Sequence, residues 1–189
     1  MTTGGTFGNR VMELAMSRFS GILAAGLLCT ACADIRAEEK PTLAAALDNE
    51  FLVKAHAANN AQIEYGKLAE KRSASQRVKD FAQQMVKDHG AAQESLGRLY
   101  KDRKFASVAG LDKEFRDERD RLAKLENSEF DRAYMKRVVE DHEKVVALYD
   151  VQVRDGKDTA IAAWAKESAP SLKKHQQLAK EVAAELGKQ

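Results

Sequence analysis

Met85-Val86-Lys87-Asp88-His89 returns later in the chain as Val138-Val139-Glu140-Asp141-His142, and the fold can be worked out from this repeat. Each copy has an aromatic residue eight positions before its histidine, namely Phe81 and Tyr134. Each histidine also falls on an apolar row at helical spacing, where a polar ring is costly without a partner. The repeat therefore predicts two amphipathic helices with inward-facing histidines, one in each of two related hairpins.

The composition is that of a chain made of long helices. The 189 residues suffice for one domain with a proper core, and they include only two prolines and eleven glycines. Lys and Arg (31) nearly balance Asp and Glu (29). This balance offers no field for nucleic acid and no sustained basic face for lipid headgroups, so we expect no nucleic acid as a partner.

Residues 1–37 are expected to be an export signal, and residues 38–189 a single helical domain whose bundle covers about 43–187. Arg10 and Arg18 precede an uncharged run, Phe19 to Ala33, that is too short to span a bilayer. Cleavage after Ala33 would start the mature protein at Asp34. We expect a mature protein without a transmembrane span, in the periplasm or associated with the outer membrane.

Two alternatives remain open for this leader. Met16, followed by Ser17-Arg18, would make a more ordinary start for a signal peptide than Met1. Both cysteines, Cys29 and Cys32, lie in the leader, so cleavage after Ala33 leaves a mature chain without cysteine. The competing hypothesis is a lipoprotein acylated on Cys32, although Cys29 stands where a leucine is usual.

Apolar periodicity predicts four long helices and one short one, with no convincing strand. The long helices are expected at about 43–72, from 76 to near 104, from a cap at Ser128 to about 154, and after the turn 155–158. A short charged helix after the loop 106–110 carries the chain from one hairpin to the next. The fold class is therefore all-α, an antiparallel four-helix bundle with a short extra helix in the connection.

Each long helix has an expected inward row, and Pro170 is expected to kink or restart the last helix because it lacks a backbone N–H. The four rows are Val53, Ala57, Ala61, Glu64 and Leu68; Val78, Phe81, Met85, His89, Ala92, Leu96 and Leu99; Tyr134 (or Met135), Val138, His142, Val145 and Tyr149; and Ile161, Trp164, Ala165, Leu172, His175, Ala179, Val182 and Leu186.

These rows bring polar residues of all four long helices into the core. His89, His142 and His175, with the carboxylate of Glu64, form a candidate set of direct metal ligands, since bundle cores hold metals in this way. Asp88 and Asp141 point about a quarter-turn aside, and suit orienting a neighbouring imidazole or pairing with Lys or Arg. The ion would be Fe, Mn, Zn or Cu.

The competing interpretation is that these are core histidines satisfied by carboxylates or carbonyls, with Asp88 and Asp141 as their partners. His56 lies on another side of its helix and is expected at the surface. The Glu-x-x-His pairs of di-iron bundles are absent, because Val86, Val139 and Leu172 stand three residues before the histidines. No activated nucleophile is evident either, so an enzyme is the least favoured class.

A family resemblance supports the fold. The segments that carry it come in order as Phe51-Leu52-Val53-Lys54-Ala55, Glu64-Tyr65-Gly66-Lys67-Leu68-Ala69, Val78-Lys79-Asp80-Phe81-Ala82, Met85-Val86-Lys87-Asp88-His89, Phe130-Asp131-Arg132-Ala133-Tyr134-Met135, Val139-Glu140-Asp141-His142 and Pro170-Ser171-Leu172-Lys173-Lys174-His175. Over about residues 51–186 the chain resembles the bacterial family called domain of unknown function 4142 (DUF4142). The resemblance implies an exported protein with a ferritin-like bundle and no assigned activity. It also implies that Glu64, Asp88, His89, Asp141, His142 and His175 are recurrent positions. Ala169 departs from the family's usual leucine.

Two hypotheses of function follow. The first is an envelope protein that binds a metal ion or small cofactor in the bundle core. The second is a structural or stress-related envelope protein whose Asp-His pairs only stabilise the bundle.

Overall fold

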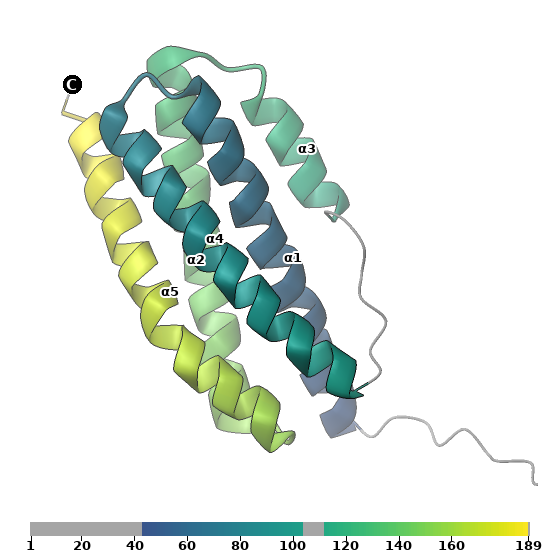
Figure 1. The fold of residues 1–189 in the computed structure, drawn as a ribbon. Helices are drawn as coiled ribbons and strands as arrows, with labels where there is room; N and C mark the ends of the chain where they lie inside the picture. Colours follow the sequence, from purple (N-terminus) through teal and green to yellow (C-terminus); the bar gives the residue numbers. More distant parts are fainter. Residues whose placement is uncertain (1–42, 104–111, 189) are drawn as a thin grey trace, which may run out of the picture. The chain divides into compact units, whose positions relative to one another are not determined.

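The computed structural model describes residues 43–103 and 112–188, which form five helices and no strand (Figure 1). The helices are α1 (Leu43–Arg72), α2 (Gln76–Arg103), α3 (Lys113–Leu122), α4 (Asn127–Asp155) and α5 (Thr159–Leu186). The predicted leader, with Met16, Cys29 and Cys32, lies outside the described residues, as does the predicted loop 106–110. None of the described helices combines the length and the apolar character that crossing a membrane requires.

The four long helices form an antiparallel bundle, as the sequence predicts. Short turns join α1 to α2 and α4 to α5, and these two hairpins have the most extensive contacts. Between the hairpins, α1 packs on α4 and α2 packs on α5. Asp48 near the start of α1 accepts a hydrogen bond from Gln152 near the end of α4, at 2.6 Å, so these neighbours also run in opposite directions. The short helix α3 lies outside the bundle, beside α1 (Figure 1).

The predicted inward rows of α2, α4 and α5 are confirmed. Their large apolar members and their histidines are buried, and only Ala92, Leu99 and Val145 are partly exposed. Burying such a row is what stabilises an amphipathic helix in water, because propensity alone is marginal. These three helices therefore present the faces on which the candidate site was predicted.

The predicted inward row of α1 is wrong by about one residue. Val53, which heads that row, is 40% exposed, whereas Leu52 and Ala55 are fully buried. The core face of α1 also holds polar side chains, so counting apolar residues selects the wrong side of the helix. The buried side chains along this face are Asp48, Phe51, Leu52, Ala55, His56, Ala58, Asn59, Ala61, Gln62, Tyr65 and Ala69.

The helix ends agree only in part with the sequence signals. Ser75 accepts a hydrogen bond from the Val78 amide at 3.4 Å, as expected of a cap. The prediction of Ser128 as the cap of α4 is wrong, because that helix starts at Asn127 and Glu126 is its N-cap residue. Gly156 ends α4, and any larger residue there would collide with Gln152.

Helix α5 runs without interruption through Pro170, so the predicted restart does not occur. Pro170 is exposed, and so is Lys166, whose carbonyl would otherwise accept the missing hydrogen bond. A proline on the solvent side leaves that carbonyl close to water. The buried face of α5 on either side of Pro170 is therefore continuous.

The core consists of two apolar clusters separated along the bundle. One contains Met85, Val138 and Ala179, and the other contains Leu96, Tyr149 and Leu172. On each of α2, α4 and α5, the inward histidine falls between these two sets in the sequence. The bundle thus carries a polar layer at mid-height, between two apolar cores.

Candidate metal centre

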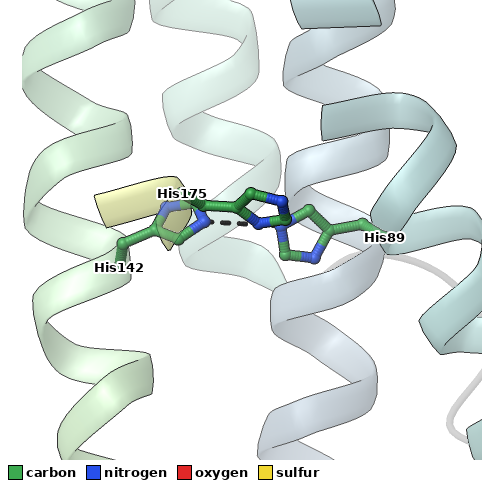
Figure 2. A group of neighbouring side chains, drawn as sticks. All are labelled: His89, His142 and His175. Atoms are coloured by element: carbon green, nitrogen blue, oxygen red, sulfur yellow. Dashed lines mark hydrogen bonds between the residues drawn. The ribbon is translucent and has the colours of Figure 1, made fainter. Parts of the chain in front are cut away.

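Three histidines from three helices meet in the polar layer (Figure 2). His89 on α2, His142 on α4 and His175 on α5 are 3%, 1% and 2% exposed. Their ring centroids lie 5.4, 5.4 and 5.7 Å apart, which makes a nearly equilateral triangle. Each ring offers a nitrogen that lies within 4.8 Å of the other two. The structure therefore brings together the three histidines that the sequence predicts.

His89 and His142 each use Nδ1 to bond a fixed oxygen. Nδ1 of His142 lies 2.9 Å from the carbonyl oxygen of Val138, which can only accept, so this nitrogen carries the proton. Nδ1 of His89 lies 2.9 Å from Oδ1 of Asn59 on α1 and donates to it in the same way. In these neutral rings the lone pair is then on Nε2, and the two Nε2 atoms face each other at 3.4 Å.

His175 uses its other ring nitrogen, Nε2, for its hydrogen bond. Its Nε2 lies 2.9 Å from a carboxylate oxygen of Asp88 and donates to it, with the Ser171 hydroxyl 3.4 Å away. Its Nδ1 is buried and has no hydrogen-bond partner in the part of the chain that the structure describes. A buried acceptor without a partner costs about 1–3 kcal/mol, so this atom calls for a physical explanation.

One nitrogen from each ring could contribute to the donor set of a single metal ion. Two nitrogens that bind one ion at about 2.0–2.1 Å with a tetrahedral angle are about 3.3–3.4 Å apart. The spacing of the two Nε2 atoms, 3.4 Å, matches this value. The second nitrogen of each imidazole donates to an oxygen, an arrangement that fixes the tautomer and orientation of metal-binding histidines.

The electrostatics of the layer keep the three rings neutral. Burial lowers the pKa of His89 well below its ordinary value, and His142 and His175 lower it further. Burial lowers the pKa of His142 to about 4, against the opposing effect of the Val138 carbonyl. Burial also lowers the pKa of His175, although Asp88 acts in the other direction. Neutral imidazole is the form that binds a metal.

The structure does not bring Glu64, the fourth predicted ligand, to this layer. Glu64 is partly exposed and pairs with Lys67 one turn along α1, at 2.9 Å. The reason is the incorrect inward row of α1. From that helix Asn59 reaches the layer instead, and it binds His89 rather than the candidate metal position.

The two aspartates of the repeat have different roles. Asp88 orients an imidazole, that of His175 on the facing helix. Asp141 forms an ion pair with Arg137 at 2.8 Å and accepts a hydrogen bond from Gln62 at 3.3 Å. Burial raises the pKa of Asp141, while Arg137 opposes that change. Asp141 therefore joins α1 to α4 and holds none of the three histidines through a described hydrogen bond.

Two polar residues of α1 were not identified correctly from the sequence. His56, predicted at the surface, is 9% exposed and contacts Gln93 and the ring of Tyr100. Asn59 is 2% exposed, and the apolar pattern of the sequence does not mark it as a site residue. The bulky side chains of α1 could have indicated the correct face, because Phe51, Leu52 and Tyr65 lie on the same side as Asn59.

The family of the chain follows from its match over most of its length. The family model described as domain of unknown function (DUF4142) matches residues 34–182. The chain belongs to this family. The expected DUF4142 resemblance is therefore confirmed, and the match takes in all three histidines of the layer.

A solved structure supports the DUF4142 fold. A Streptomyces coelicolor protein described as a secreted protein of domain of unknown function 305 (DUF305) is similar, with a TM-score of 0.65. The similarity covers 75% of this chain and 92% of that protein, at 14% sequence identity. At this identity the likeness concerns the fold alone. No curated protein matches the chain.

Proposed function

We propose that this DUF4142 protein binds one metal ion in its core, through Nε2 of His89, Nε2 of His142 and Nδ1 of His175. The observation that carries the proposal is the convergence of three buried histidines, with Nδ1 of His175 lacking a partner among the described residues. Each ring is oriented by its own oxygen acceptor. Imidazole donors suit Zn, Cu, Fe and Ni, and three of the four metals expected from the sequence are among these.

The proposed role is binding rather than catalysis. The three ligands are at least 97% buried, and the donor set lacks the carboxylates with which di-iron bundles bind and react with oxygen. The polar layer also lies between two apolar clusters and lines none of the three described cavities. We therefore assign the protein to the metal-binding proteins of the cell envelope, with export supported by the sequence of residues 1–37.

The test is the metal content of the purified protein after refolding with Fe, Mn, Zn or Cu salts. We expect about one ion per chain for wild type, and a loss of at least tenfold in affinity for His175→Gln and for the double variant His89→Ala, His142→Ala. Glu64→Gln is the matched control, since it removes the fourth predicted ligand and should bind as wild type does. Circular dichroism checks that each variant is folded. A wild type that retains none of these metals would refute the proposal.

The second candidate function is a bundle stabilised by histidine hydrogen bonds alone. It is favoured by the 3.4 Å contact of the two Nε2 atoms, because reversing the Asn59 amide would let His89 donate to His142. His142→Ala would then cost about 1–3 kcal/mol of stability without any ligand. If metal raises the melting temperature of wild type but not of His175→Gln, this function is excluded. It leaves Nδ1 of His175 without a partner, which is why we favour metal binding.

A further inference from the structure

The charges around the polar layer restrict the charge of the ion. This step rests on the proposed metal binding and concerns which ion the three histidines hold. The direct ligands are imidazoles, which are neutral when they bind a metal. Among the described residues, the group of side chains that could share an ion contains no carboxylate and no thiolate. The ligands themselves therefore compensate none of the ion's positive charge.

One of the groups that hydrogen-bond to the ligands carries a negative charge. His89 is held by the neutral amide of Asn59 and His142 by the neutral carbonyl of Val138, whereas His175 is held by the carboxylate of Asp88. The Asp88 side chain is 32% exposed. It also lies 3.5 Å from the Gln84 amide, and no lysine or arginine among the described residues forms an ion pair with it.

The other charged groups near the layer are neutralised or face the solvent. Asp141 directly precedes His142 on α4, but it is paired with Arg137, whose guanidinium also contacts Glu114. Lys174 acts on His175 electrostatically, and its side chain is exposed to solvent. The ligands with their hydrogen-bonded oxygens therefore carry one negative charge, that of Asp88.

An ion of one positive charge balances this environment. The cost of moving an ion out of water rises with the square of its charge, so uncompensated charge is most unfavourable in a buried layer. Zn²⁺ would leave one positive charge without compensation, and it also prefers a fourth ligand. Three nitrogens suffice for Cu⁺, a monovalent ion that accepts three-coordinate sites. We infer that the centre is selective for Cu(I), with Asp88 supplying the compensating charge.

The inference predicts how the selectivity for Cu(I) over Zn(II) changes with the charge of the groups that hydrogen-bond to the histidines. Asn59→Asp adds a second carboxylate, on His89, in the way that Asp88 acts on His175. This variant should raise the affinity for Zn(II) at least tenfold, and it should raise the affinity for Cu(I) by a smaller factor. Asp88→Asn removes the one negative charge carried by the ligands and their hydrogen-bonded oxygens, and it should lower the affinity for Cu(I) about tenfold. Asp150→Asn is the control, because Asp150 is an exposed carboxylate paired with Lys173 and should change neither affinity.

The experiment is a competition for each ion against a chromophoric chelator, with Cu(I) under anaerobic conditions and with Zn(II). Wild type should hold one Cu(I) per chain in the presence of a tenfold excess of Zn(II). Displacement of Cu(I) by that excess would overturn the inference and leave the proposed metal binding intact, provided that His175→Gln abolishes the Zn(II) binding. Failure of wild type to bind either ion would overturn the inference, and failure to bind iron and manganese as well would also refute the proposed metal binding. The wild-type competition decides the matter even if a variant does not fold.

Discussion

At the scale of single residues, the two nitrogens of each imidazole have different roles in the polar layer. One nitrogen is fixed by an oxygen acceptor, and the other carries the lone pair. In this buried layer the Nε2 lone pairs of His89 and His142 face each other at 3.4 Å, and they repel unless something positive lies between them. The same burial disfavours protonation of the rings, so a proton is a poor substitute for a metal ion.

This burial makes the stability of the metal-free protein depend on pH. The folded-state pKa of His142 is lowered to about 4, whereas the unfolded chain takes up its proton near 6.5. The stability is therefore fully present above pH 6.5 and is lost as the pH falls toward 4, with His89 and His175 acting in the same direction. Urea unfolding of the metal-free protein should show the free energy of unfolding decreasing from pH 6 to pH 5.

His142→Gln should reduce that dependence by about 1 kcal/mol per pH unit, since it removes one of the protons that only the unfolded chain binds. Glu64→Gln is the control and should keep the wild-type slope over the same interval. Equal slopes for wild type and His142→Gln would contradict a lowered pKa in the folded state.

At the scale of helices, α5 combines a proline in its middle with a continuous buried face. The proline removes a backbone hydrogen bond and its ring crowds the preceding turn, which destabilises a helix interior. Because Pro170 is exposed, its ring does not disturb the packing of the buried face of α5. Pro170→Ala should therefore raise the free energy of unfolding by about 1–3 kcal/mol, measured by chemical denaturation.

The control for this prediction is Glu167→Ala, at another exposed position of α5, which should change the stability by less than about 0.5 kcal/mol. A destabilised Pro170→Ala variant would show that the proline shapes α5 in a way that the buried face requires.

The helices also show why the sequence predicted one part of the site and missed another. On α2, α4 and α5 a histidine interrupts an otherwise apolar row, so the period of the row survives and places the ring inward. On α1 four polar residues occupy the core face, and each contacts a partner on another helix or on the turn after α4. Gln62 meets Asp141 and Asn59 meets His89, contacts that no local pattern reveals. Hydrophobic counting therefore favoured the neighbouring row and Glu64.

At the scale of the whole molecule, the fold of the described part places no constraint on residues 1–42, whose role rests on their sequence. We propose export with cleavage after Ala33, because a short apolar run ends there in small residues. Intact-mass spectrometry of the protein from the envelope should give a chain that starts at Asp34 and contains no cysteine.

Cys32→Ser is the matched test of the competing lipoprotein hypothesis. Cleavage after Ala33 removes this residue, so the variant should yield the same mature mass and distribution as wild type. A wild-type mass that retains Cys32 with added acyl groups, lost in Cys32→Ser, would contradict the proposal and favour a lipid anchor.

The distribution of the three histidines over both hairpins determines when, during folding, the three side chains can come together. The first hairpin supplies one of them, and the second supplies the other two, with His175 on the final helix. A chain that is still being synthesised or threaded through a membrane holds no complete set of donors. The proposed ion binding must therefore wait until the last helix has docked, and the compartment where folding finishes would determine which ions the protein can meet.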